Sequence, residues 1–256
     1  MLKAITRAIS PAMNRCELEY LERQEIDLAK AAGQHEAYER FLAEMGASVL
    51  ALPALADLPD SVFVEDPAVV VDEVAVMTRM GAPTRLREVE SLADALARFR
   101  PLRWLQEPAT LEGGDVLRIG RKIFVGASAR TNAAGIDQLR RELEPFGYTV
   151  EAVEVRRCLH LKSAVTYLGD GAVLVNRSLI DTDPLRAYRM IDVAAEEPWA
   201  ANTLALGGTV LIPSAYPATT GILARAGYTV RAIDISELMK AEAGLTCSSI
   251  IFENRS

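Results

Sequence analysis

The sequence predicts one α/β domain over residues 1–256, built from five strand–strand–helix–strand units that close into a five-bladed propeller. One observation is a near-verbatim repeat: FGYTVEAV at 146–153 and AGYTVRAI at 226–233 each follow a helix-like stretch, at 132–146 and 217–226. A second is that residues capable of chemistry recur at intervals of roughly 40–50 residues, the range typical of propellers and solenoids. A third is an apolar run at 247–252 that can pair with residues 2–9 and so close the ring.

Each unit is predicted from its own stretch of sequence. Pairs of short apolar strands are expected within residues 62–79, 110–126, 158–175 and 203–213, and the two chain ends supply a fifth pair. A helix that ends at a glycine and leads into a strand is the other recurring feature, because glycine favours helix termination. This pattern is clear in the two repeats, is present at 41–53 and is looser at 95–108. The alternative is an ordinary α/β sheet with some similar units.

Composition limits the classes of protein that the chain can represent. Of its 256 residues 50% are hydrophobic and 25% charged, so it can bury a substantial core. No apolar run approaches the ~20 residues needed to span a membrane, and a net charge of −7 gives no reason to expect a nucleic-acid partner. Three widely spaced cysteines argue against a disulfide framework and favour the reducing cytoplasm. Blade edges could also pair two copies as a homodimer.

One chemically capable residue recurs at the same point of each unit. The first strand of each unit is expected to face the ring axis, and these strands are predicted at 63–67, 111–115, 159–163, 200–202 and 246–249. Any one of their polar residues could be a hydrogen-bonded core or turn residue, since buried polar groups need partners. Their convergence predicts an active site on the central axis. The residues are Asp66, Glu112, His160, Asn202 and Cys247.

The two histidines and three cysteines narrow the chemistry. His35 lies on an apolar helical pattern and is predicted to pack within a helix, which leaves His160 for acid–base work. Cys16 and Cys158 fit structural roles, whereas Cys247 lies among small polar residues in the fifth unit. A cysteine with a histidine that an acidic group orients is a general arrangement for nucleophilic catalysis. We therefore predict Cys247 as the nucleophile and His160 as its acid/base partner.

Four carboxylates lie in the same segments, namely Glu65, Asp66, Glu112 and Asp115. Negative neighbours raise the pKa of a thiol and would make Cys247 a poor nucleophile. The cluster makes sense with a cationic substrate, because carboxylates bind a guanidinium by paired hydrogen bonds and its charge favours the thiolate. A metal site is the competing interpretation, but the histidines and cysteines lack zinc-ligand spacing. We predict neither a metal nor another cofactor.

An ordered set of motifs resembles a known family. The motifs are PDSVFVED (59–66), the Thr-Arg pair at 78–79 with Arg85, LEGGD (111–115), SARTN (128–132), LHLKS (159–163) and LTCSS (245–249). Each motif alone is a weak signal of the family. All of them in this order are a strong signal, which covers essentially the whole chain. In this respect the sequence resembles the dimethylarginine dimethylaminohydrolases, guanidine-modifying enzymes whose pentein fold is a five-bladed ββαβ propeller.

The resemblance implies a reaction and a role for each site residue. Cys247 would attack the guanidinium carbon of an N-omega-methylated arginine, dimethylarginine or monomethylarginine, to form a covalent thiouronium-like adduct. His160 would protonate the departing amine and then activate water, which yields citrulline and a methylated amine, while Glu112 would orient His160 and contact the guanidinium. The implied binding groups are Asp66 at the guanidinium, Arg85 and Arg130 at the α-carboxylate, and Asp60 and the carbonyl of Leu18 at the α-amine, while Glu65 and the backbone near Ala241 complete the pocket.

One segment departs from the family pattern, and related proteins offer alternatives. Residues 15–22 match the family's flexible lid but are more charged and hold an extra cysteine, so the preferred guanidino substrate stays open. Arginine deiminases usually carry an aspartate where Lys162 stands, and amidinotransferases are longer. A non-catalytic alternative exists, because the same propeller serves as a ribosome-binding translation factor. Cys247, His160 and Glu112 on the axis favour the enzyme.

Overall fold

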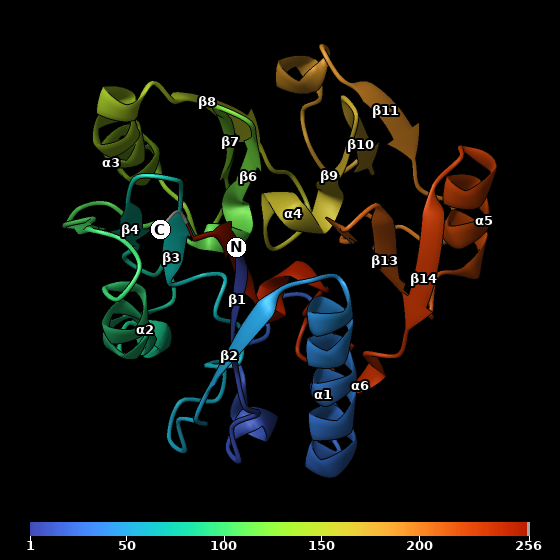
Figure 1. The fold of residues 1–256 in the computed structure, drawn as a ribbon, viewed down its shortest axis with the longest axis horizontal. Coiled ribbons are helices and arrows are strands. Elements are labelled where there is room, and N and C mark those ends of the chain that lie inside the picture. The colour runs from blue at the N-terminus through green and yellow to red at the C-terminus, as the bar shows by residue number, and fades with distance from the viewer. Residues whose placement is uncertain (255–256) are drawn as a thin grey trace.

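Five small sheets form a ring around a central axis in the computed structural model, which describes residues 1–254 (Figure 1). In each sheet the first two strands are antiparallel and the third strand runs parallel to the middle one. The predicted five-bladed ββαβ propeller is thereby confirmed. The blades are β15 (Ile250–Glu253), β1 (Leu2–Arg7) and β2 (Ser48–Leu52); β3 (Ala68–Val70), β4 (Ala75–Met77) and β5 (Leu102–Trp104); β6 (Val116–Ile119), β7 (Lys122–Ala127) and β8 (Thr149–Glu154); β9 (Val165–Gly169), β10 (Ala172–Val175) and β11 (Arg189–Asp192); and β12 (Leu204–Leu206), β13 (Thr209–Pro213) and β14 (Thr229–Ile233).

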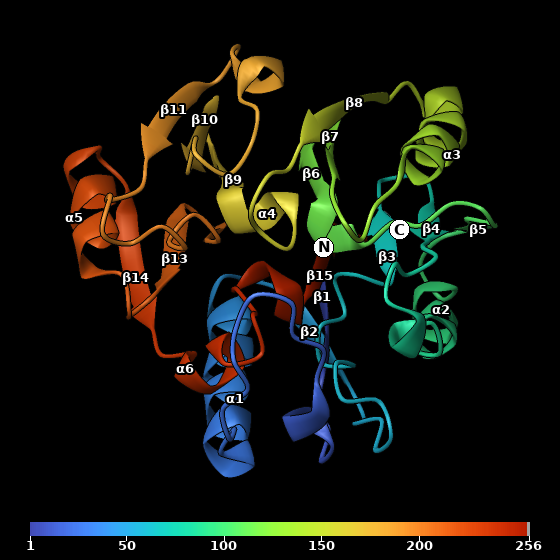
Figure 2. The ribbon, with the colours of Figure 1, turned by 180° about the vertical axis from the view of Figure 1, so that it is seen from behind.

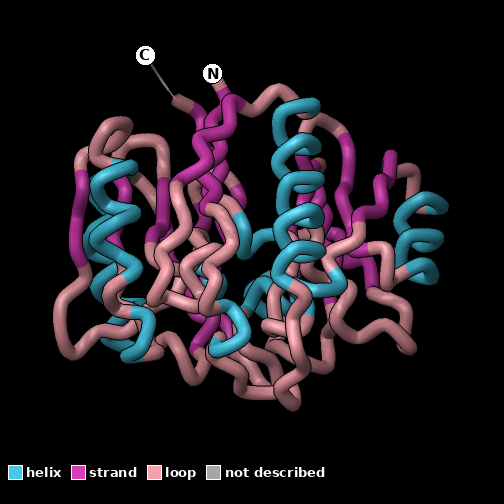
Figure 3. The backbone as a smooth tube through the Cα atoms, turned by 90° about the horizontal axis from the view of Figure 1, so that it is seen from below, coloured by secondary structure: helices cyan, strands magenta, loops and turns pink. Residues whose placement is uncertain are grey.

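The two ends of the chain close the ring as predicted. Strand β1 pairs antiparallel with β15, with Leu2 opposite Glu253 and Ile5 opposite Ile250. Seen from the side, the chain ends lie at one end of the ring and many of the long loops lie at the other (Figure 3). Because Cys247 precedes β15 and the described chain ends just after it, Cys247 lies at the end of the axis away from the termini.

Helices connect the middle and outer strands of four blades, namely α1 (Leu28–Glu44), α2 (Glu88–Leu96), α3 (Ala133–Leu143) and α5 (Pro217–Arg225). The fourth blade differs from the prediction, because its connection holds only the 3₁₀ turn Asp183–Leu185. Residues 179–181 of that connection bond instead to residues 154–156 at the end of β8, which leaves little of it to form a helix. Two further short helices are α4 (Leu161–Ala164) and α6 (Ser236–Met239). Among the described residues, no helix combines the length and the apolar character needed to cross a membrane.

The sequence repeat marks the turn from a helix into the outer strand of its blade. Gly147 (φ 77°) precedes β8 and Gly227 (φ 93°) precedes β14. Both have left-handed backbone conformations, which glycine adopts without the steric penalty of a side chain. At the other end of α3, the side chain of Asn132 accepts a hydrogen bond from the backbone N–H of Gly135 at 2.8 Å and caps the helix.

Five apolar clusters stabilise the ring, one at each boundary between neighbouring blades. The second and third blades, for example, meet through Val69 and Val76 on one side and Ile123 and Val125 on the other. Burial of apolar surface is the main driving force for folding, so the blades stabilise one another around the axis. His35 lies on α1 and is 3% exposed, which confirms its predicted place in a packed helix.

The five axial segments are not strands, which corrects the prediction. Each lies directly before the first strand of its blade as a turn, a 3₁₀ helix (Gly113–Asp115, Thr246–Ser248) or α4. The physical reason is that their backbones bond to one another across the axis. The N–H of Glu65 donates to the carbonyl of Cys247 at 3.2 Å, and that of Gly113 donates to the carbonyl of Asp66 at 2.9 Å.

Candidate active site

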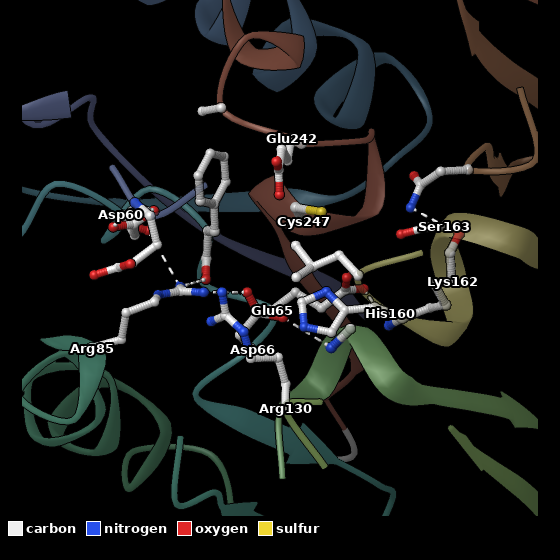
Figure 4. A pocket seen from close by; sticks show the side chains of 17 residues that line it. Asp60, Glu65, Asp66, Arg85, Arg130, His160, Lys162, Ser163, Glu242 and Cys247 are labelled. Atoms are coloured by element: carbon white, nitrogen blue, oxygen red, sulfur yellow. Dashed lines mark hydrogen bonds and ion pairs between the residues drawn. The ribbon is translucent and has the colours of Figure 1, made fainter. Parts of the chain in front are cut away.

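A pocket lies where the axial segments meet. Figure 4 shows side chains from several blades that point into this pocket. Two predicted residues do not line it: Glu112 is fully buried beside it and bonded to His160, and Leu18 lies half-buried in the segment 15–22. The predicted residues that do line it are Asp60, Glu65, Asp66, Arg85, Arg130, His160, Ala241 and Cys247.

His160 and Glu112 form a buried pair. Nε2 of His160 lies 2.9 Å from Oε2 of Glu112, and the other carboxylate oxygen accepts the N–H of Ala82 at 3.1 Å. Burial alone would lower the pKa of His160, but Asp66, Asp115 and Glu112 outweigh it and raise the pKa to about 9. Burial would raise the pKa of Glu112, but the hydrogen bond and charge of His160 lower it to about 2. The pair is therefore an imidazolium–carboxylate pair at neutral pH.

Two aspartates fix the surroundings of this pair. Asp66 accepts the N–H of Gly114 at 2.9 Å and the guanidinium Nη1 of Arg85 at 2.7 Å. Asp115 accepts the N–H of Leu161 at 2.9 Å, next to His160, and two hydroxyl groups hold its other oxygen. A carboxylate with several donors is both satisfied and rigidly placed, so the axial segments of the second, third and fourth blades are tied together.

Cys247 lies in the 3₁₀ turn just before β15 and is only partly exposed. Burial raises the pKa of its thiol to about 12, with further contributions from Glu65 and Asp66. Lys162 and the N–H of Gly244 oppose this increase but do not outweigh it. The resting thiol is therefore protonated at neutral pH, and a cation near the sulfur would be needed to favour the thiolate.

Glu65, Lys162 and Asn202 form a bonded set beside Cys247. Glu65 pairs with Nζ of Lys162 and also accepts the hydroxyl of Thr246 at 2.8 Å. Asn202 accepts the N–H of Thr246 at 3.0 Å and donates to the carbonyl of Lys162 at 3.1 Å. The turn that carries the nucleophile candidate is thus anchored to the second blade through Glu65 and to the fifth through Asn202.

The two arginines differ in how fully they are already bonded. Arg85 is 4% exposed, and its guanidinium donates to Asp66, to Glu88 and weakly to two backbone carbonyls. Arg130 has longer contacts, at 3.3 Å to Glu19 and 3.5 Å to Glu112. Arg130 is therefore the more available of the two for an incoming anion.

The segment of residues 15–22, called the lid segment below, lies against the pocket. Both carboxylate oxygens of Asp60 accept the N–H of Glu17 at 3.2 Å. The hydroxyl of Tyr20 donates to the carbonyl of Cys158 at 3.2 Å. Figure 2 shows the blue chain that leads into α1 looping beside the red segment that follows α6. That red segment includes Ala241 and Cys247.

One group of side chains has the geometry of a cation site. Asp66, Glu112 and His160 each offer a ligand atom, and these atoms lie within 4.8 Å of one another. All three are already engaged, however, because His160 and Glu112 bond to each other and Asp66 bonds to Arg85. A metal ion would have to break these contacts.

Several residues that hold the site together were not predicted from the sequence. Lys162 stands out in the sequence only as a difference from deiminases, yet it is the ionic partner of Glu65. Glu88 has no signal beyond its place on a helix, and it holds Arg85. Ser128 and Thr131 both lie in the motif SARTN, where only Arg130 is predicted to act, and both donate to Asp115.

Comparisons with known proteins agree with the fold and the site. The family model described as arginine deiminase matches residues 53–200. The dimethylarginine dimethylaminohydrolase of Streptomyces coelicolor is 42% identical over 97% of this chain and 96% of its own. The enzyme of the same name from Pseudomonas aeruginosa is 36% identical over 88% of this chain and 90% of its own.

A solved structure matches the whole ring. It is a cysteine-to-serine mutant of the Pseudomonas aeruginosa enzyme complexed with citrulline. The TM-score is 0.93 at 34% identity, and the match covers 98% of this chain and 100% of the other. The chain therefore belongs to the dimethylarginine dimethylaminohydrolase family, within the guanidine-modifying propeller enzymes.

Proposed function

We propose that the chain is a cysteine hydrolase that converts N-omega-methylated arginine into citrulline and a methylated amine. The observation that carries this proposal is the meeting of a thiol, an imidazolium–carboxylate pair and further carboxylates in one pocket. Such a pocket suits a cationic guanidinium, which bonds to carboxylates and makes ionisation of the thiol more favourable. Membership of the family supports the same reaction.

The reaction begins when the cation enters. Asp66 and Glu65 face the guanidinium, and its charge displaces the thiol proton of Cys247 to solvent. The thiolate sulfur then forms a bond to the guanidinium carbon. The bond from that carbon to the methylated nitrogen breaks as the His160 imidazolium donates its proton to this nitrogen. The methylated amine leaves, and the substrate stays bound to Cys247 as a thiouronium.

Water completes the cycle. His160, now neutral, accepts a proton from a water molecule that attacks the thiouronium carbon. The carbon–sulfur bond breaks, the remaining hydroxyl proton of that water passes to the departing sulfur, and citrulline forms with the thiol of Cys247 restored. Glu112 stabilises the imidazolium at each step, because the two charges are 2.9 Å apart in a buried place. The pair is thus suited to donate a proton first and to accept one later.

The amino-acid end of the substrate meets the other side of the pocket. Arg130 binds the α-carboxylate, assisted by Arg85, which also lines the pocket. Asp60 and the carbonyl of Leu18 bind the α-amine, and the backbone at Ala241 completes the wall. The three cysteines are free thiols, which supports work in a reducing compartment, the cytoplasm.

Product analysis tests this function. Purified enzyme is given dimethylarginine, monomethylarginine or arginine at equal concentration, and citrulline, methylamines and ammonia are measured. A methyl contact is worth about 1–3 kcal/mol, so some turnover of arginine, on the order of 10–200-fold slower, is compatible with the proposal. A higher kcat/KM for arginine than for either methylated substrate would contradict it.

Variants test the residue roles. Cys247→Ser should fold and bind substrate while turnover falls by orders of magnitude, because the thiolate is the reacting group. Cys16→Ser and Cys158→Ser are the matched controls and should keep most of the activity. Turnover by Cys247→Ser at the rate of the unmodified enzyme would remove Cys247 from the mechanism.

A further inference from the structure

Glu242 binds the lid segment through three successive backbone N–H groups. One of its carboxylate oxygens, Oε1, accepts hydrogen bonds from Glu19 at 3.0 Å, Tyr20 at 2.6 Å and Leu21 at 2.6 Å. Successive backbone N–H groups that converge on one point form an anion-binding concavity. A charged acceptor also makes each hydrogen bond stronger than a neutral one would.

The second oxygen of Glu242 is buried and has no hydrogen-bond partner among the described residues. Glu242 and Cys247 both line the pocket, and Figure 4 shows the carboxylate on the side where Cys247 lies. Buried carboxylate oxygens are normally satisfied, and leaving one unpaired is costly. A donor that enters the pocket would remove this cost.

The backbone at Glu242 also has an unusual conformation. Its φ is 59°, in the left-handed region that non-glycine residues seldom adopt. Strain of this kind is found mainly where the surrounding structure holds a side chain in a functional position. Here it follows helix α6 and turns the carboxylate toward the lid segment.

The other contacts of Glu19 and Tyr20 each involve a single side-chain group. Tyr20 reaches the carbonyl of Cys158 by one hydroxyl, although the residue is 46% exposed. Glu19 pairs with Arg130 at 3.3 Å, and that arginine is needed for the substrate in the proposed function. Glu242 holds three successive backbone N–H groups, so it provides the principal attachment of residues 19–21, next to the Asp60 contact at Glu17.

We propose that Glu242 is a positioning residue that holds the lid segment closed, and that its second oxygen accepts an N–H of the substrate guanidinium. One carboxylate would then bind the lid and the substrate together, so that each favours binding of the other. Only the second half of this proposal rests on the proposed function. The first half concerns the protein without substrate.

Hydrogen exchange tests the attachment without any activity. The amides of Glu19, Tyr20 and Leu21 should exchange about 10–100-fold faster in Glu242→Ala than in the unmodified protein, since each loses its charged acceptor. Glu22→Ala is the matched control, because that lid glutamate is exposed and its side chain does not hold these amides, and it should leave their exchange unchanged. Unchanged exchange in Glu242→Ala would overturn the proposal.

Steady-state kinetics tests the link to substrate. In Glu242→Ala, KM for the best guanidino substrate should rise about 10–100-fold while kcat changes less than about threefold, as expected for lost binding rather than lost chemistry. Glu242→Gln keeps one acceptor oxygen, so its KM should lie between those of the unmodified enzyme and Glu242→Ala. It replaces the alanine variant if that variant fails to fold. An unchanged KM would overturn the coupling to substrate.

A third measurement separates this proposal from the proposed function. Substrate bound to Cys247→Ser should add protection at the three lid amides, and should add none in Cys247→Ser/Glu242→Ala. If exchange responds to Glu242 but no methylated arginine is turned over by the unmodified enzyme, the attachment stands and the proposed function fails. If methylated arginine is turned over normally but amide exchange is the same with and without the Glu242 carboxylate, the proposed function stands and the attachment fails.

Discussion

The reactivity of Cys247 should depend on the charge of the reagent that approaches it. Burial, together with Glu65 and Asp66, raises the pKa of this thiol to about 12. At that pKa about one thiol in 10⁵ is ionised at neutral pH. A neutral alkylating agent such as iodoacetamide should therefore react slowly, with a rate that increases about tenfold for each pH unit well beyond neutrality.

A small cation in the pocket should change this balance by a calculable amount. A unit positive charge about 4 Å from the sulfur, at an effective dielectric constant of about 20, stabilises the thiolate by about 4 kcal/mol. This equals about 3 pKa units. Chloroacetamidine, a small amidinium with a leaving chloride, should thus meet roughly 10³ times more thiolate at neutral pH than iodoacetamide does.

Second-order inactivation rates test this difference. Both reagents are compared between about pH 6 and pH 10, and each rate is divided by that of the same reagent with a free thiol of ordinary pKa. Mass spectrometry locates the adduct, with the buried Cys16 and Cys158 as internal controls. A thiol pKa near 8 with iodoacetamide, or equal normalised rates for both reagents, would refute the reasoning, because the carboxylates would then not control the thiol.

Three other changes probe the support of the site. Glu112→Gln should lower the pKa of His160 from about 9. A raised histidine pKa adds stability that is complete below about pH 6.5 and lost as pH rises through the folded value, so urea unfolding should show a loss of up to about 3 kcal/mol near pH 6 that shrinks through neutral pH and is nearly gone by about pH 9. In Gly114→Ala the new Cβ would lie 2.5 Å from Nδ1 of His160, so kcat should fall about 10²-fold, whereas Gly33→Ala, with open space around it, should not affect kcat. Asn202→Ala breaks the bonds from its axial segment to those of Lys162 and Thr246 and should lower kcat at least about tenfold through misplacement of the nucleophile; an unaltered kcat would show that the turn holds without it.

The architecture could be predicted because its signals are local and repeated. A glycine that ends a helix and leads into an outer strand occurs in both copies of an eight-residue repeat, so the roles of Gly147 and Gly227 can be predicted from the sequence. The phase of the axial residues is also periodic, which is why the sequence alone suffices to place Asp66, His160 and Cys247 around one axis. The missing helix of the fourth blade shows the limit of this reasoning, because a repeat unit tolerates replacement of one element by a turn.

The partners of the site residues could not be predicted, because no local pattern records them. Glu65 pairs with Lys162, 97 positions later, and accepts a bond from Thr246, 181 positions later. Glu242 meets amides more than 220 positions away. These contacts form only when the ring closes, and the bonding partner is often a backbone group, which carries no sequence signal at all.

The carboxylates that oppose ionisation of Cys247 give the site its selectivity. Without a cationic ligand, burial and the carboxylates of Glu65 and Asp66 disfavour the thiolate despite Lys162, so neutral molecules in the pocket meet an unreactive thiol. The proposed product, citrulline, is a neutral urea, whereas the proposed substrate is a cation. When the charge disappears at the end of the reaction, the thiolate loses its stabilisation and takes up a proton again. The same electrostatic arrangement therefore activates the nucleophile toward substrate and disfavours its attack on product, without any change in the protein.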